Sequence, residues 1–152
     1  MIIQSKLQKA ILAARIAIFI VFFWFGLLKV IGLSPAESLV TDLFNLTLKN
    51  FMPIEIFLPI FGLFECILGV LWLIPSLTRI SFFTLCFHML CTFLPMVFLI
   101  NQTWQNFLTL TLVGQYIMKN LVIIALGFLI WQYYGLQKSL SLKPSRLLKK
   151  VA

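Results

Sequence analysis

One acidic residue lies in the middle of a stretch that is long and apolar enough to cross a lipid bilayer. The stretch runs from Ile56 to Ile74 and reads IFLPIFGLFECILGVLWLI, with Glu65 near its centre. A central carboxylate costs about 2.5 to 3.5 kcal/mol on an insertion scale, and the apolar residues around it outweigh that cost. Inside lipid, Glu65 must be neutral, reach water or face a basic partner, and acids in such positions commonly mark a pathway or a site.

Side chains that can meet this carboxylate occur in the other apolar stretches. His88 lies near the middle of its stretch, as Glu65 does. A carboxylate and an imidazole in contact can hold or pass a proton. Lys29 and Lys119 lie near the outer ends of their stretches, and a lysine side chain can reach several Å along a helix. The sequence therefore predicts a buried polar site in which Glu65 meets His88 and one of these lysines.

A structural role is the competing interpretation of each of these residues. Arg15 and Lys29 can extend toward lipid head groups from the ends of a span. His88 can be a hydrogen-bonded core residue rather than a haem or metal ligand; because the chain has one histidine, a bis-histidine haem within one chain is excluded. No metal site is predicted. The cysteines lie in apolar stretches without C-x-x-C spacing, which favours small buried residues over a redox pair: Cys66, Cys86 and Cys91.

Composition identifies the class of protein that has to position these residues. Of the 152 residues, 62% are hydrophobic and 11% are charged, and the mean hydropathy is +1.07. Soluble domains are nearer 45–50% apolar and about 25% charged, so we predict an integral membrane protein of one domain. Lys and Arg number 12 against four Asp and Glu. These basic residues lie mostly near the chain ends beside apolar stretches, which indicates contact with the lipid bilayer and argues against nucleic-acid binding.

The hydrophobic pattern predicts four spans, at about 11–32, 54–74, 80–100 and 116–134. No small-x-small cleavage site follows the first, so we predict a retained span in preference to a cleaved signal peptide. Ser34-Pro35-Ala36-Glu37 can start a helix, and the amphipathic segment 34–52 is too polar to span. We expect it on the outer membrane surface, re-entrant, or folded over the mouth of the helices. The basic segment 135–152 is predicted to be a cytoplasmic tail, and the positive-inside rule places both termini in the cytoplasm.

At about 100° per residue, each span presents one stripe of polar or small residues. We therefore predict an all-α fold, an antiparallel four-helix membrane bundle with the stripes turned inward. The stripes are Arg15, Phe22, Gly26 and Lys29; Leu58, Gly62, Glu65, Gly69 and Trp72; Ser81, Thr84, His88, Thr92 and Pro95; and Lys119, Asn120, Gly127 and Tyr134.

Three blocks of sequence resemble a known family. They are WFGLLK at 24–29, GLFECILGVLWLIP at 62–75 and LTLVGQYIMKNLVIIALG at 110–127. Together they resemble the DoxX and DoxX-like family of small four-helix bacterial membrane proteins, over about residues 12–135. The resemblance implies a multi-pass protein of the bacterial inner membrane, and the family name comes from a subunit of a thiosulfate:quinone oxidoreductase. It singles out Arg15, Trp24, Gly26, Lys29, Gly62, Glu65, Gly69, Gly114, Lys119 and Asn120.

The residues and the resemblance together give the predicted site. The catalytic candidates are Glu65, His88 and Lys119, and the ligand-binding candidates are Arg15, Trp24, Lys29 and Asn120. The favoured function is a redox-associated subunit with a quinone as candidate cofactor and a soluble or membrane oxidoreductase subunit as partner. One alternative is a non-catalytic membrane anchor or assembly partner. Another is a small-solute channel or transporter, which would need a homo-oligomer because four helices make a thin wall. Whether the chain is itself an enzyme stays open.

Overall fold

Four long helices form the body of the protein, as the all-α prediction requires. The computed structural model describes residues 2–148, with side chains described for residues 4–140; residues 149–152 of the predicted basic tail lie outside the described residues. The long helices are α1 (Ile2–Val30), α3 (Ile54–Leu73), α4 (Thr78–Phe93) and α7 (Leu112–Leu148). Within the described residues, four helical segments are long and apolar enough to cross a membrane: Gln4–Val30, Ile54–Leu73, Pro75–Phe98 and Leu112–Leu140.

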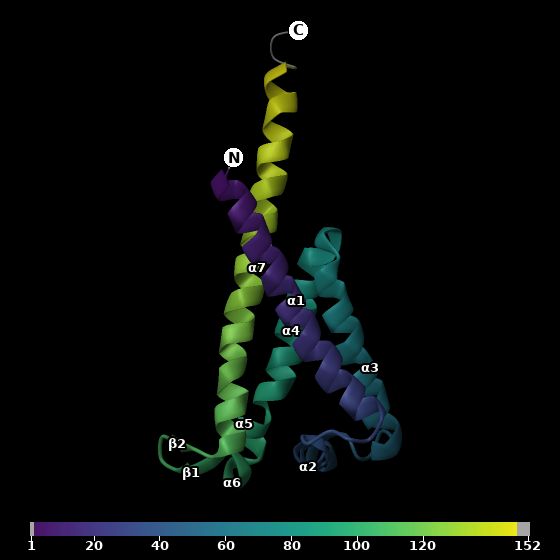
Figure 1. The fold of residues 1–152 in the computed structure, drawn as a ribbon. Helices are drawn as coiled ribbons and strands as arrows, with labels where there is room; N and C mark the ends of the chain where they lie inside the picture. Colours follow the sequence, from purple (N-terminus) through teal and green to yellow (C-terminus); the bar gives the residue numbers. More distant parts are fainter. Residues whose placement is uncertain (1, 149–152) are drawn as a thin grey trace.

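The long helices contact one another in a closed order. α1 packs against α3, α3 against α4, α4 against α7, and α7 against α1. Successive helices run in opposite directions, so the start of α1 and the turn between α3 and α4 lie toward the same end (Figure 1). We call this the terminal end, and the opposite end, which carries α2 and the connection before α7, the loop end. α1 and α7 continue past the α3–α4 turn at the terminal end (Figure 1).

Proline sets the ends of the two middle helices. Pro53 precedes α3, and Pro75 opens the short 3-10 helix η1 (Pro75–Leu77) between α3 and α4. α4 ends at Phe93, just before Pro95 begins the four-residue helix α5 (Pro95–Phe98). Because proline lacks an N–H and clashes with the preceding turn, it is tolerated at a helix start and interrupts a helix interior. The span predicted at 80–100 is therefore broken near its loop end, before α6 (Ile100–Thr103).

The segment between the first two spans folds over the loop end of the helices. It contains α2 (Glu37–Thr47), which contacts α3 and α5 (Figure 1). Phe44 of α2 is 3% exposed, and its ring centroid lies 4.9 Å from that of Phe57 on α3. On the other side, Gln102 donates a hydrogen bond of 2.7 Å from Nε2 to Asp42 Oδ2. Three placements were expected from the sequence. The structure shows the last of them, in which this segment folds over the loop end of the long helices.

We expect Phe44→Ala to detach α2 while leaving the long helices intact. Phe44 supplies the buried contact of this helix, and Phe→Ala at a buried position typically costs about 3–5 kcal/mol. The measurement is hydrogen exchange, which should rise in residues 37–47 and stay unchanged in α3 and α4. Leu46→Ala is the control, because Leu46 lies on the same helix and is exposed. Unchanged exchange in residues 37–47 of Phe44→Ala would show that α2 is held by other contacts.

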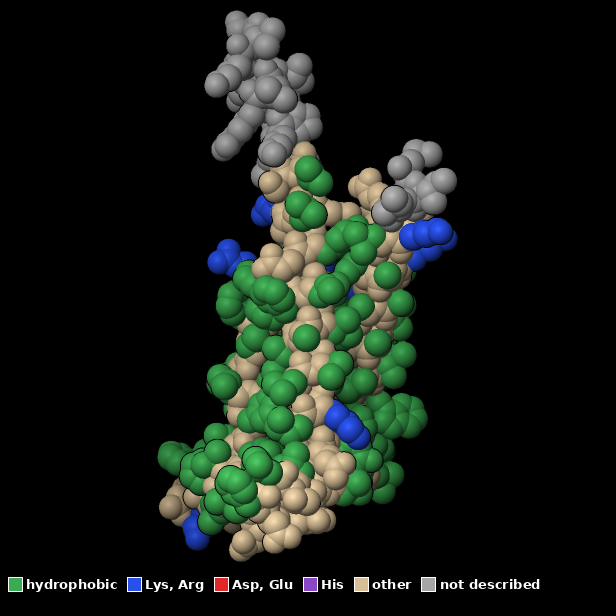
Figure 2. Space-filling view, turned by 90° about the vertical axis from the view of Figure 1, so that its left-hand side faces the viewer, with side chains coloured by type: hydrophobic (Ala, Val, Ile, Leu, Met, Phe, Trp, Pro, Cys, Tyr) green, Lys and Arg blue, Asp and Glu red, His purple; other side chains and the backbone are tan. Residues whose placement is uncertain are grey.

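The outer faces of the long helices are apolar. Figure 2 shows hydrophobic side chains over most of the middle of one face, with Lys and Arg mainly toward the ends. Large hydrophobic residues are exposed on all four helices, for example Phe25, Ile67, Phe87 and Val122. Monomers in water rarely expose so much contiguous apolar surface, whereas lipid tails cover such a surface at no cost. The interior core includes Phe22, Leu68, Trp72, Leu85, Met89 and Ile130.

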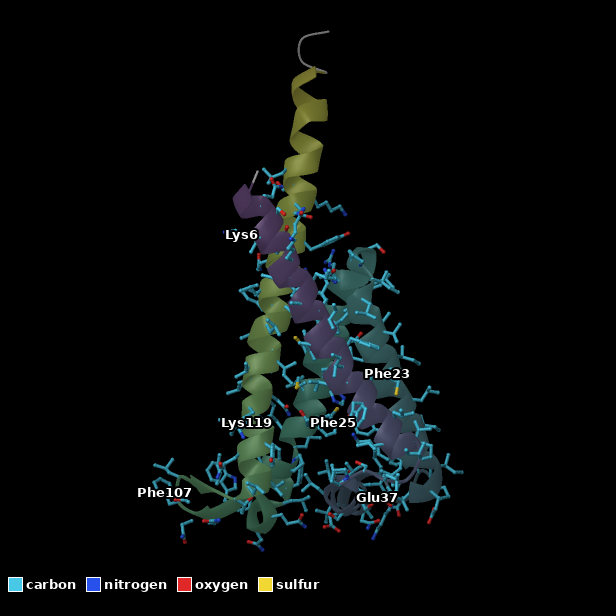
Figure 3. All side chains as sticks on the ribbon, viewed as in Figure 1. Lys6, Phe23, Phe25, Glu37, Phe107 and Lys119 are labelled. Atoms are coloured by element: carbon cyan, nitrogen blue, oxygen red, sulfur yellow. The ribbon has the colours of Figure 1, made fainter. Side chains whose placement is uncertain are left out.

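A β-hairpin that the sequence did not predict joins α6 to α7. Its strands are β1 (Trp104–Asn106) and β2 (Thr109–Leu110), paired antiparallel with an irregular register. Phe107 at the tip is 92% exposed, and Figure 3 places it pointing away from the helices. Leu108 adopts a positive φ of 63°, the left-handed turn conformation that is uncommon for a residue other than glycine.

Candidate functional site

Two glycines bring the backbones of α1 and α3 into direct contact, and this contact positions the site. A Cβ atom built on Gly62 would lie 2.6 Å from the carbonyl oxygen of Gly26, and one on Gly26 would lie 2.5 Å from that of Gly62. No side chain fits at either position, so the helices approach as closely as small residues permit. Lys29 and Glu65 each follow three residues after one of these glycines. The close approach therefore holds their side chains opposite one another.

Lys29, Glu65 and His88 form a buried polar cluster between α1, α3 and α4, which we call the central cluster. Lys29 donates from Nζ to Glu65 Oε2 at 2.5 Å. The other carboxylate oxygen, Oε1, lies 3.4 Å from His88 Nε2. The three residues are 7%, 5% and 2% exposed, respectively. One carboxylate thus faces an ammonium group and an imidazole at the same time, which suits the transfer of a proton between the three groups.

Aromatic rings enclose the imidazole of the central cluster. The ring centroid of His88 lies 5.3 Å from Phe22, 5.5 Å from Phe61 and 5.9 Å from Phe64. Its Nδ1 atom is buried and has no hydrogen-bond partner among the described residues. An unpaired buried polar nitrogen costs about 1–3 kcal/mol, and such a group in a native structure calls for an explanation. The sequence predicted His88 as a site residue and placed Phe22 on an inner stripe, but it gave no sign that Phe61 and Phe64 lie against the imidazole.

Lys119 lies outside the central cluster, which corrects its assignment to the inner stripe of the fourth span. It is exposed, and its Nζ lies 4.7 Å from the ring centroid of Tyr116. Figure 3 marks it on α7, on the opposite side of the molecule from α3. Adjacent residues on a helix point about 100° apart, so Lys119 and Asn120 do not face the interior together. Asn120 is the half-buried one, and its Nδ2 donates to Thr92 Oγ1 at 3.4 Å.

The remaining ligand-binding candidates, Trp24 and Arg15, also lie apart from the central cluster. Trp24 is 62% exposed and points away from the interior. Arg15 is buried, but its guanidinium donates to the carbonyl oxygen of Trp72 at 2.9 Å and to Thr78 Oγ1 at 2.6 Å. Those partners belong to the end of α3 and the start of α4. Arg15 therefore marks a second polar location, at the terminal end and apart from the central cluster.

The cysteines and the other residue types that bind metals are dispersed in the part of the chain with described side chains. No group of three or more His, Cys, Asp or Glu residues there could hold a metal ion. Cys66, Cys86 and Cys91 are all free thiols. Cys66 donates from Sγ to the carbonyl oxygen of Phe23 at 3.6 Å, so it takes part in the contact between α1 and α3. Cys66 is therefore a small interior residue, as predicted, whereas Cys86 and Cys91 are half-buried.

Comparison with known proteins does not assign this chain to a family. No protein-family model, no curated protein and no solved structure matches this chain. The resemblance to the DoxX family therefore stays a prediction from the three sequence blocks. What is known of the site comes from its own geometry: a buried cluster of Lys29, Glu65 and His88 among aromatic rings, and a separate buried guanidinium.

Proposed function

We propose that this chain is a multi-pass membrane protein in which the central cluster moves a proton within the membrane, as part of a redox-associated subunit. Support for the membrane comes from the four apolar helices and their exposed hydrophobic faces. The proposal places the protein in the bacterial inner membrane as an antiparallel bundle with both termini in the cytoplasm, since positive charge gathers at the terminal end. Membership of the DoxX-like family belongs to the same proposal.

The unpaired Nδ1 atom of His88 is the observation that carries this function. An ion pair between Lys29 and Glu65 would suffice to join α1 to α3. A buried imidazole with one nitrogen near the carboxylate and the other without a partner among the described residues adds the cost of an unsatisfied polar atom, which joining α1 to α3 does not require. Ionisable groups inside membrane spans are expensive, and they characteristically line proton or substrate pathways. A histidine that contacts a carboxylate on one side can exchange a proton with a ligand on the other.

A quinone fits the chemistry of this location, although the rings pack closely around the imidazole. Because Nε2 faces the Glu65 carboxylate, His88 would donate from Nδ1 to a carbonyl oxygen in its imidazolium form, and Phe61 and Phe64 would supply stacking surfaces. Both rings are half-buried, so they form the wall between the imidazole and the surrounding lipid. When bound, a quinone would supply two-electron redox chemistry coupled to proton uptake. The electron donor would be a partner oxidoreductase subunit.

Binding of a short-chain ubiquinone analogue to the purified protein in lipid nanodiscs tests this proposal. Quenching of intrinsic tryptophan fluorescence reports binding. We expect saturable quenching in the unmodified protein and about tenfold weaker binding in His88→Leu, because a hydrogen bond to a carbonyl oxygen is lost. The matched control is Phe87→Leu, since Phe87 neighbours His88 on α4 but is exposed on the outer face. Absence of saturable quenching, or equal affinity in His88→Leu and Phe87→Leu, would contradict the proposal.

A non-catalytic assembly subunit is the second candidate, and the close contact of α1 with α3 favours it. Gly26 and Gly62 lock the backbones together, and the ion pair between Lys29 and Glu65 lies beside them. In that case the central cluster is a structural clasp. The two candidates differ in one respect: a clasp predicts that His88→Leu changes stability without changing quinone affinity.

A further inference from the structure

Arg15 is a buried cation without an acidic partner. It is 5% exposed, and within the described part of the chain its hydrogen bonds go to two neutral oxygens, Trp72 O and Thr78 Oγ1. The chain holds only four side-chain carboxylates. Glu65 is taken by Lys29, and the others lie in α2 or in the first turn of α3: Glu37, Asp42 and Glu55. A buried charge is normally paired, because leaving it alone is costly.

A cavity of about 170 Å³ adjoins this guanidinium. At about 30 Å³ for each water molecule of the liquid, it has room for about five waters, enough for a small polar group and too little for lipid chains. Its polar lining comes from α1 and α7: Gln8, Arg15, Tyr133, Tyr134 and Gln137. None of the described residues that line it carries a carboxylate. Gln137 Nε2 donates to the hydroxyl oxygen of Tyr133 at 2.6 Å, which leaves the hydroxyl hydrogen of Tyr133 able to donate elsewhere.

In the membrane placement proposed above, the cavity lies near the boundary between lipid tails and water. Pro75, at the turn between α3 and α4, contributes to its wall. α1 and α7 extend beyond that turn (Figure 1), and the exposed residue Lys6 lies on the projecting part of α1 (Figure 3). This is the level at which the phosphate groups of a bilayer lie, just outside the hydrocarbon core.

We propose that the Arg15 cavity binds an anionic phosphate group: the phosphodiester of an anionic lipid head group, or a soluble phosphate ester. A guanidinium group is the side chain best suited to bind phosphate oxygens. The phenol and carboxamide groups around it add neutral donors from a second helix. The anion supplies the charge that Arg15 lacks within the protein, and it ties α1 to α7 at the terminal end. This site is separate from the central cluster and does not depend on its role.

The test measures the thermal unfolding temperature of the purified full chain in a neutral detergent as ligand is added. A ligand that binds the folded state raises this temperature in a saturable way. The probes are a short-chain phosphatidylglycerol, the matching phosphatidylcholine, and glycerol phosphate. We expect a saturable rise with phosphatidylglycerol and little with phosphatidylcholine, whose head group carries its own cation. A comparable rise with glycerol phosphate would identify a soluble phosphate ester as the source; its absence would identify the lipid.

Two variants and one control distinguish binding at this site from nonspecific attraction of anions to a positively charged protein. Arg15→Gln should weaken the apparent affinity at least about tenfold, because charge-assisted hydrogen bonds are lost. Tyr134→Phe keeps the guanidinium and the ring, so it tests the cavity even if Arg15→Gln fails to fold; we expect a loss of about threefold. Arg79→Gln removes the same charge from an exposed residue at the same end and should leave affinity unchanged. Equal affinities in Tyr134→Phe and Arg79→Gln, or equal effects of the two lipids, would overturn the proposal.

Discussion

Replacing Gly62 with alanine is expected to lower the thermal unfolding temperature strongly, whereas the same replacement at Gly135 should leave it unchanged or raise it slightly. A Cβ atom at Gly62 would lie 2.6 Å from Gly26 O, 2.8 Å from Lys29 Cβ and 3.0 Å from Val30 N. Two of these three atoms belong to the backbone of α1, so the whole helix must move. Overpacking of this kind costs about 1–3 kcal/mol and occasionally more.

Gly135 is the matched control for this experiment. A Cβ atom there meets nothing within 4 Å, and alanine is favoured over glycine in a helix interior by about 0.5–1 kcal/mol. The two variants thus carry the same substitution with opposite expected signs. The measurement is fluorescence-detected unfolding of both purified variants in one detergent. If Gly62→Ala unfolded at the same temperature as Gly135→Ala, the direct contact between the backbones of α1 and α3 would be wrong.

The second large effect on the free energy of unfolding is expected from breaking the ion pair of the central cluster. Lys29→Met leaves the carboxylate of Glu65 buried without its cation, and Glu65→Gln leaves the ammonium group of Lys29 without its anion. Removing one partner of a buried ion pair typically costs about 3–5 kcal/mol. Replacing both at once removes the charges together, and such exchanges are often close to neutral. The double variant should therefore be more stable than either single variant.

A double-mutant cycle in equilibrium denaturation measures this coupling. We expect an interaction free energy of at least about 1 kcal/mol, since residues in direct contact are coupled. Lys119→Met is the control, because this exposed lysine contacts Tyr116 rather than an acid and its removal should have a small effect. Strictly additive losses in the two single variants would mean that Lys29 and Glu65 do not interact in the folded protein.

The sequence predicted much of the interior because lipid imposes a simple rule. When the outside is hydrocarbon, the few polar and small residues of a span must face inward, and a 100° repeat then identifies the face. Gly26, Lys29, Gly62, Glu65 and His88 were placed inward on this basis, and all are buried in the structure. The helix type followed from the same rule, because a single apolar segment that crosses lipid must satisfy its own backbone.

The sequence could not predict the features that depend on the distances between helices or on the residues at which helices end. The positions of Lys29 and Lys119 along their spans allowed either of them to meet Glu65. In the structure Lys29 is the partner, because the glycine contact brings α1 close to α3. One hydrogen-bond partner of Arg15 is the backbone oxygen of Trp72, which is available because α3 ends at the next residue, Leu73. The hairpin after α6 was missed because its strands have three and two residues, too few for an alternating pattern.

The contact between α1 and α3 also bears on how the chain is made. Synthesis proceeds from the N-terminus, so Lys29 leaves the ribosome before Glu65, and His88 follows last. On the proposed insertion into a bilayer, Glu65 would enter after the span that carries its counter-ion, Lys29. In that order the pairing of Glu65 with Lys29 would not depend on a later helix, and α4 would add His88 to the pair.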